Sequence, residues 1–184
     1  RYLSSAASDV YKRQPENPFE LTREEAKVIG TENDKTDTIW LGYYNEPRLI
    51  YTAPAFKKGP WKASNRRTVH IAIDVFANKG TKLYAPMEGE VFTAEYRDSP
   101  LDYGGVVILK HTTPDNDEFF TLYGHLDPQF LDALQVGDKI DKGQEFCKLG
   151  GPDVNGGWAP HVHFQIAMTT CLLYTSDAAD DRYR

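Results

Sequence analysis

The chain has 184 residues, of which 40% are hydrophobic, and this is enough for one domain with its own core. Its formal net charge is −6, and this acidic balance argues against nucleic acid as a partner, because phosphate binding needs clustered Lys and Arg. No run of about 18 apolar residues is present, so no membrane span is predicted. Cys147 and Cys171 form neither a CxxC pair nor a disulfide framework, and Cys147 is expected to be a small core residue in a strand.

The two ends of the chain are predicted not to belong to the protein. A back-translation of Ser4–Gln14, read on the complementary strand and one base out of frame, encodes Cys171–Asp180. Two unrelated protein segments do not encode each other's complement by chance, and the DNA resembles a transposase adaptor used to prepare sequencing libraries. We therefore expect residues 1–14 and 170–184 to be disordered sequencing-adaptor scars, and the gene to continue in both directions.

Residues 15–67 are interpreted as an N-terminal extension of the main domain. Leu21–Ile29 reads as one short helix, with Thr22 as its N-cap. Thr38–Tyr51 reads as two short extended pieces around a turn at Asn45–Pro47. A loop with a basic cluster completes the extension.

The texture changes at residue 68 to short strands separated by glycine-marked turns. Strands that recur every 8–12 residues or so, without crossover helices, are typical of an antiparallel all-β domain. The predicted fold class is therefore all-β, an antiparallel sheet or barrel-sandwich with a short N-terminal helix and loops. One helical turn is expected in Asp127–Leu134, and Gly150–Ala159 is a Gly-rich loop. The predicted strands are Thr68–Phe76, Lys82–Ala85, Glu90–Arg97, Val106–His111, Phe119–Gly124, Glu145–Leu149 and His161–Ala167.

Two strands carry polar side chains in a pattern that points to chemistry. Alternate side chains of a strand share a face, so His70 and Asp74 are predicted to lie on one side of the first strand. The same alternation places His161 and His163 on one face of the last strand, with Val162 directed into the core. Each motif alone has an ordinary explanation, such as a hydrogen-bonded surface pair.

A further histidine, His125, follows the predicted strand Phe119–Gly124. Together with the two strand motifs it accounts for four of the five histidines, and His111 is interpreted as structural. Two imidazoles and a carboxylate form a donor set that zinc accepts, with a fourth position for water. Two further imidazoles match what metal-assisted hydrolysis needs, which is a base for the water and a hydrogen-bond donor for the developing oxyanion.

The run HxxxD, then YGHL, then HxHF resembles the zinc peptidases of the lysostaphin and LytM type, over about Thr68–Ala167. The resemblance implies a core built as a duplicated hybrid motif, and it extends to the turns around Gly80–Pro86 and Val136–Gln144. This sequence has Ala72 where the family's HxGxD motif has glycine. The residue-by-residue match implies that the zinc ligands are His70, Asp74 and His163. It also implies that the two catalytic histidines are His125 and His161.

The resemblance implies that residues 68–169 form a zinc-dependent metalloendopeptidase that hydrolyses peptide bonds with a metal-activated water. Peptide cross-links of peptidoglycan are the family's usual substrate. One of His125 and His161 would take the proton and the other would stabilise the tetrahedral intermediate, and the sequence leaves open which does which. The loops Gly150–Gly157 and Arg97–Tyr103 are expected to border the site.

A closer resemblance is to the peptidase-like middle module of large bacterial fusion proteins, which lies between a kinase-like phosphotransferase domain and a class III aminotransferase domain. In that setting the protein would be cytoplasmic, whereas a wall peptidase would act in the cell envelope. Two alternatives follow: a hydrolase of a small amino compound within the fusion, or a non-catalytic module, against which the retention of all five site residues argues. The matching segments are Tyr44–Phe56, Arg67–His70, Leu101–Gly104, Phe120–Leu126 and Asn155–Phe164.

Overall fold

The computed structural model describes residues 39–47 and 69–169. The predicted helix Leu21–Ile29 and both predicted adaptor scars lie outside these residues. No helix in the described part of the chain is long and apolar enough to cross a membrane.

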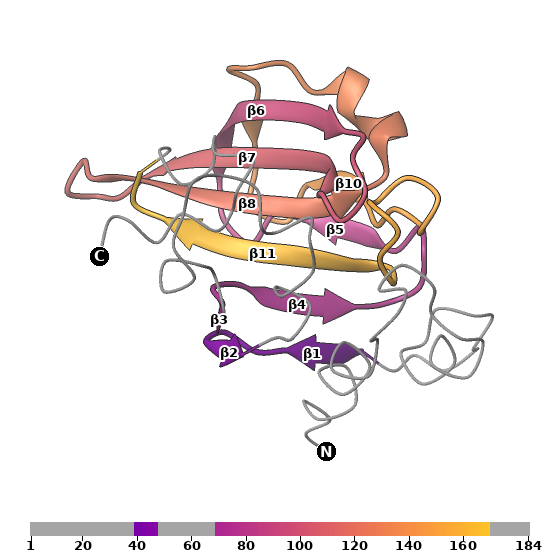
Figure 1. The fold of residues 1–184 in the computed structure, drawn as a ribbon. Helices are drawn as coiled ribbons and strands as arrows, with labels where there is room; N and C mark the ends of the chain where they lie inside the picture. The colour runs from indigo at the N-terminus through magenta and orange to yellow at the C-terminus, as the bar shows by residue number, and fades with distance from the viewer. Residues whose placement is uncertain (1–38, 48–68, 170–184) are drawn as a thin grey trace, which may run out of the picture.

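The described residues form short and medium-length strands and one 3-10 helix (Figure 1). Every strand pair is antiparallel, so the predicted antiparallel all-β class is confirmed. The elements are β1 (Trp40–Gly42), β2 (Glu46–Pro47), β3 (Val69–His70), β4 (Ile73–Phe76), β5 (Lys82–Tyr84), β6 (Gly89–Arg97), β7 (Gly104–Thr112), β8 (Glu118–Leu126), η4 (Pro128–Ala133), β9 (Lys139–Ile140), β10 (Glu145–Lys148) and β11 (His161–Ala167).

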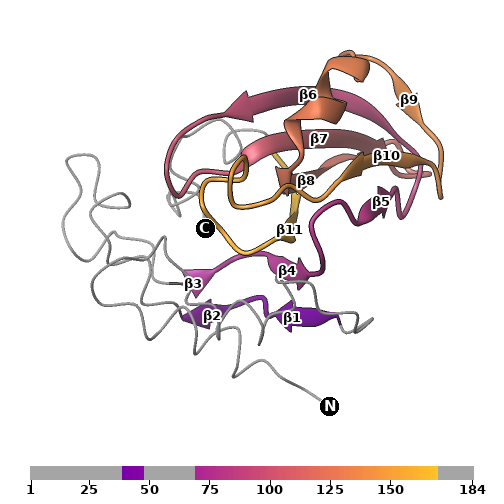
Figure 2. The ribbon, with the colours of Figure 1, turned by 90° about the vertical axis from the view of Figure 1, so that its right-hand side faces the viewer.

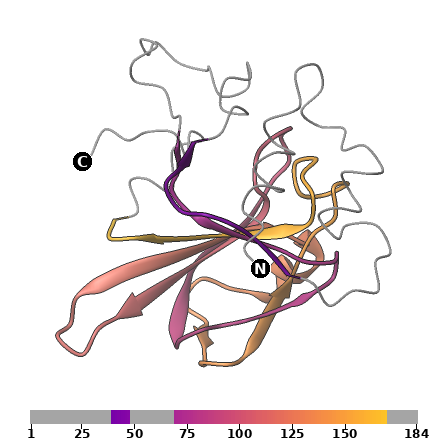
Figure 3. The same cartoon turned by 90° about the horizontal axis from the view of Figure 1, so that it is seen from below.

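Seven strands make the main sheet, in the order β1-β4-β11-β8-β7-β6-β9. In Figure 1 they follow one another from β6 at the top to β1 at the bottom. The view from below shows β1 in front and the strands fanning apart, which is the normal twist of a sheet (Figure 3). Two small sheets, β10-β5 and β2-β3, complete the fold, and in Figure 2 β5, β9 and β10 lie at the opposite end from β3.

The main core lies between the seven-stranded sheet and the segment that contains β5, η4 and β10. Strand β7 is buried on both faces over most of its length, as its apolar run predicts for a central strand. The predicted helical turn is confirmed as η4, where the Asp127 carboxylate accepts a hydrogen bond from the Gln129 backbone N–H at 3.1 Å. The buried members of this cluster are Ala85, Val91, Val107, Leu109, Tyr123, Leu126, Leu131, Ile140, Phe146, Cys147, Leu149 and Val162.

The first predicted strand, Thr68–Phe76, is in fact two strands. The chain breaks at Ile71–Ala72, where it changes partners: His70 on β3 pairs with Glu46 on β2, whereas β4 pairs with β1 and β11. The burial pattern still alternates, because Ala72 is buried and Ile73 is 41% exposed. The other six predicted strands match the structure to within two residues, whereas β9, in a segment interpreted as turns, was not predicted.

The turn in the N-terminal extension comes earlier than predicted. Tyr44 and Asn45 form it, with Asn45 at φ 62°, and Glu46–Pro47 already belongs to β2. Asparagine tolerates this left-handed conformation better than most residues. Strand β1, also from the extension, is the edge strand beside β4, so the extension contributes directly to the main sheet.

Candidate metal centre

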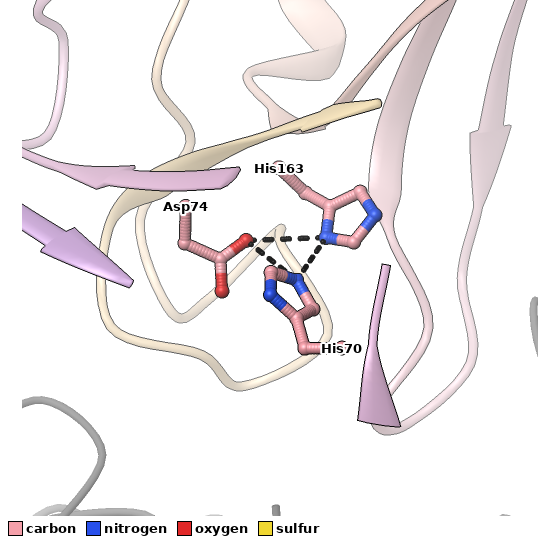
Figure 4. A group of neighbouring side chains, drawn as sticks. All are labelled: His70, Asp74 and His163. Atoms are coloured by element: carbon pink, nitrogen blue, oxygen red, sulfur yellow. Dashed lines mark hydrogen bonds and ion pairs between the residues drawn. The ribbon is translucent and has the colours of Figure 1, made fainter. Parts of the chain in front are cut away.

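Three side chains that the sequence singled out converge at one point. His70 Nε2 lies 3.1 Å from His163 Nδ1 and 3.2 Å from Asp74 Oδ1, and His163 Nδ1 lies 3.1 Å from the same carboxylate oxygen. Figure 4 shows these three atoms directed at one another from three different strands. All three residues are buried.

This triangle of donors has the chemistry and the size of a zinc site. Zinc binds imidazole nitrogen and carboxylate oxygen at about 2.0–2.2 Å, and in a tetrahedron such ligand atoms lie roughly 3.3–3.5 Å apart. The observed separations of 3.1–3.2 Å need only small adjustments to reach that value. The residues present therefore fit a tetrahedral zinc ion with one position left open.

The strand register explains why Asp74 and His163 meet. These two residues are direct partners across the β4–β11 pair, so their side chains leave the same face side by side. His70 reaches the same point from β3, beyond the break at Ile71–Ala72. Its Nδ1 lies 3.1 Å from the carbonyl oxygen of Tyr43. A carbonyl oxygen only accepts hydrogen bonds, so Nδ1 carries the proton, and the lone pair of Nε2 faces the Asp74 oxygen and the His163 nitrogen.

His161 lies next to this triangle and is held from two sides. It is the cross-strand partner of Phe76, and the two rings are stacked with centroids 4.7 Å apart. Its Nδ1 donates to the carbonyl oxygen of Ala159 at 2.6 Å. The lone pair of the neutral ring is then on Nε2, which lies 3.8 Å from Asp74 Oδ1.

His125 occupies a β-bulge, where the sequence predicts the end of a strand. Strand β8 continues to Leu126, but Gly124 and His125 together oppose the single residue Val106 on β7. His125 has φ 65°, a conformation that is uncommon for a residue with a Cβ. A bulge of this kind redirects a side chain, and it explains why His125 turns toward the site although the strand continues.

Three backbone hydrogen bonds fix His125 in the bulge. Its N–H donates to Tyr103 O at 2.8 Å, its carbonyl accepts from Gly150 N–H at 2.9 Å, and its Nδ1 donates to Asn155 O at 3.0 Å. Its ring centroid is 4.2 Å from that of His161.

The surroundings of His125 keep its imidazole neutral. Burial lowers the pKa of His125 well below the usual histidine value, and the neighbouring imidazoles of His161 and His163 lower it further. The Asp74 carboxylate and the hydrogen bond to Asn155 oppose this shift without reversing it. A neutral ring at pH 7 has a lone pair that can accept a proton.

Both predicted bordering loops contact the histidines. The Tyr103 hydroxyl of the first loop lies 3.4 Å from His163 Nε2, and the Asn155 carbonyl of the second lies 3.0 Å from His125 Nδ1. The ring of Trp158, the residue that follows the second loop, packs edge-on against His125 with centroids 5.8 Å apart. The loops are joined to each other, because Trp158 Nε1 donates to Asp102 O at 3.2 Å. Asn155, which the sequence did not mark for any role, lies at the centre of the second loop and is completely buried.

The structure thus brings all five sequence-predicted residues together. His70, Asp74, His125, His161 and His163 are between 0% and 5% exposed. Their neighbours Phe76 and the Tyr43 carbonyl were not predicted, although the strand alternation from Asp74 to Phe76 offered a signal for Phe76. Tyr103 and Asn155 lie in the two loops that were expected to border the site, but neither residue was singled out.

The two remaining residues considered in the sequence behave as structural groups. His111 is held at both nitrogens, by Glu88 O at 2.6 Å and by Thr121 Oγ1 at 2.7 Å, and it belongs to no group of candidate metal ligands among the described residues. Cys147 is buried in the main core, and burial raises the pKa of its thiol to about 12, as expected of a core residue and not of a nucleophile.

An antiparallel sheet that holds a buried His–Asp–His donor set beside two further imidazoles has the kind of site that metal-dependent hydrolases use. The model of peptidase family M23 matches residues 68–172, which is more than half of the chain. The chain therefore belongs to peptidase family M23, a family of metallopeptidases.

Several solved structures are similar to this chain. The catalytic domain of the antimicrobial peptidase lysostaphin from Staphylococcus simulans is 24% identical, with a TM-score of 0.49 over 77% of this chain and 86% of that one. A structure of LytU is 23% identical, with a TM-score of 0.47 over 73% and 77%. The catalytic domain of the prophage-encoded M23 protein EnpA from Enterococcus faecalis is 20% identical, with a TM-score of 0.46 over 75% and 85%. No curated protein matches the sequence.

Proposed function

We propose that this protein is a zinc-dependent endopeptidase that cleaves peptide cross-links of the peptidoglycan type. One observation carries the proposal: three donor atoms of zinc-ligand chemistry lie 3.1–3.2 Å from one another in a chain of peptidase family M23. His70, Asp74 and His163 are the proposed ligands. Zinc bound there would supply a Lewis acid and would lower the pKa of its water toward about 7.

The proposed roles of His125 and His161 rest on their position beside the donor triangle. Each has its Nδ1 proton committed to a backbone carbonyl, so each presents Nε2 for proton transfer or hydrogen bonding. One of them is neutral and accepts the proton of the attacking water at Nε2. The other donates a hydrogen bond to the oxygen of the scissile carbonyl, which requires a second proton on its Nε2, so it acts as an imidazolium. Two histidines fixed by the backbone can do this without reorganising during the reaction.

The substrate assignment comes from the family. The similar lysostaphin domain is the catalytic domain of an antimicrobial peptidase, and peptidoglycan cross-links are the substrates to test first. The acidic balance of the chain is compatible with a peptide substrate and argues against nucleic acid.

The test measures zinc content and hydrolysis in the same preparations. Purified protein is analysed for zinc by mass spectrometry and then incubated with peptidoglycan sacculi, and new amino termini are quantified. We expect one zinc per chain and released peptides, both lost in His163→Ala. His111→Gln is the matched control, because His111 is an equally buried histidine away from the site and should leave zinc content unchanged. Protein without stoichiometric zinc after loading would refute the proposal.

A second candidate rests on the sequence resemblance to the fusion module, whose longest matching segments include Asn155–Phe164. In that setting the same site would hydrolyse an amide of a small amino compound in the cytoplasm. Recovery of the complete gene separates the two candidates, because an upstream kinase-like domain favours the fusion and an export signal favours a cell-envelope peptidase.

A further inference from the structure

Asn155 has the hydrogen bonding of a residue that fixes the shape of its loop. Its side-chain amide donates to Trp158 O at 2.9 Å and to Gly150 O at 3.3 Å, and its Oδ1 accepts from the Trp158 backbone N–H at 2.9 Å. The side chain is 0% exposed, so water cannot replace these bonds. One amide group thereby ties the beginning of the Gly150–Trp158 loop to its end.

The same residue holds His125 through its main chain. The carbonyl of Asn155 accepts the Nδ1 proton of His125 at 3.0 Å, and this bond selects the Nδ1–H tautomer. The direction of that carbonyl depends on the loop, because the next residue, Gly156, has φ 86° and its carbonyl accepts from Leu101 N–H. A change in the Asn155 side chain must therefore move the atom that orients His125.

The indole of Trp158 extends the same arrangement. Both its backbone N–H and its carbonyl are bonded to the Asn155 side chain, and its ring packs against His125 and His161 with centroids 5.8 Å and 6.5 Å away. Asn155 thus sets two of the surfaces that confine His125, which are a hydrogen-bond acceptor and an aromatic wall. Within the described part of the chain, none of its hydrogen bonds goes to a proposed zinc ligand.

We propose that Asn155 is a positioning residue that holds His125 in the Nδ1–H tautomer and in the orientation needed for proton transfer. This inference rests on the proposed function of His125. The Asn155 side chain makes its hydrogen bonds within its own loop and not to the proposed metal ligands. Its effect on catalysis is therefore indirect, through the loop that it closes.

The experiment compares Asn155→Asp and Asn155→Ala with a matched control. Asp keeps the acceptor for Trp158 N–H but directs an oxygen at two carbonyl oxygens, whereas Ala removes all three bonds. Thr121→Val is the control, because Thr121 is equally buried. This variant loses the hydrogen bonds of the Thr121 hydroxyl to His111 and Tyr123, on another part of the sheet. The readouts are the ¹⁵N chemical shifts of the His125 ring, zinc content, and kcat and KM on peptidoglycan peptides.

We expect wild-type protein and the Thr121→Val variant to show the Nδ1–H tautomer of His125 and the same kcat. The Asn155 variants should retain zinc, show a mixture of tautomers and lose kcat on the order of 10²-fold, with KM little changed, as is usual when a reacting group is displaced by about an ångström. Wild-type ¹⁵N shifts and kcat in either Asn155 variant would overturn the inference. So would the Nε2–H tautomer in the wild-type protein, a measurement that stands even if both Asn155 variants unfold. Wild-type protein that hydrolyses no peptide would refute the proposed function, while the tautomer measurement still decides the inference.

Discussion

Replacing His161 by alanine should separate catalysis from metal binding. His161 and His163 lie two positions apart on β11, and they are 2% and 4% exposed, so they form a matched pair on one strand. His163 contributes a donor atom to the triangle with His70 and Asp74, whereas His161 does not. We therefore expect His161→Ala to keep zinc and lose activity, and His163→Ala to lose zinc itself.

The size of both effects can be worked out from the contacts of His161. The variant loses the stacked contact with Phe76 and the hydrogen bond to Ala159 O, each worth about 1 kcal/mol, and leaves a small cavity. The total of roughly 2–4 kcal/mol is less than the usual free energy of unfolding of about 5–15 kcal/mol, so the variant should fold. Loss of a general acid–base group should slow hydrolysis by roughly 10²–10⁴-fold.

The assay measures zinc by mass spectrometry and initial rates of peptide hydrolysis on the same samples of wild type, His161→Ala and His163→Ala. His161→Phe is a useful fourth protein, because it preserves a ring against Phe76 and removes only the ring nitrogens. If His161→Ala lost zinc to the same extent as His163→Ala, or if it hydrolysed peptide at the wild-type rate, the assignment of roles on β11 would be wrong.

Three further predictions test other parts of the structure. Burial raises the pKa of the Cys147 thiol to about 12, so in a Cys171→Ser chain iodoacetamide near pH 8 should leave Cys147 unmodified in the native protein and alkylate it in urea. Rapid labelling of the native protein would contradict the burial of Cys147. Gly156→Ala should lower the urea midpoint far more than Gly137→Ala. Both glycines have positive φ, but of the two only Gly156 would bring a Cβ against a backbone oxygen, that of Asp102, and equal effects would argue against this tight loop contact. Folding lowers the pKa of His125, so the unfolded chain binds more protons than the folded one as the pH falls below about 6.5. The free energy of unfolding of the zinc-free protein should therefore decrease from pH 7 to pH 5. In His125→Gln the free energy of unfolding should depend less steeply on pH.

Alternation within single strands was the part of the site that could be predicted from the sequence. The pattern HxH places His161 and His163 on one face and Val162 on the other, and Val162 does lie in the main core. The pattern HxxxD placed His70 and Asp74 together although the strand between them is broken, because burial still alternates across the break. Periodicity survives a change of pairing partner, and this is why the pattern was informative.

The position of His125 could not be read from periodicity. A bulge adds one residue to one strand without any change in composition, and the left-handed conformation normally signalled by glycine is adopted here by a histidine. The signal next to it is Gly124, where a Cβ would lie 2.5 Å from the Tyr103 ring. That glycine marks a close approach of the first loop, but only the assembled sheet shows which side chain the approach redirects.

The orientation of His70 depends on a part of the chain that lies before the family match. The match begins at residue 68, but the acceptor that sets the His70 tautomer is the carbonyl of Tyr43. The same segment supplies β1, which covers the edge of β4 opposite β11, and Asn45 N–H, which donates to His70 O at 2.7 Å. An imidazole whose second nitrogen lacks an acceptor can rotate or change tautomer, and a ligand in that state binds metal more weakly. The functional unit is therefore larger than the family domain, because the residues that hold the donors are as much a part of the site as the donors themselves.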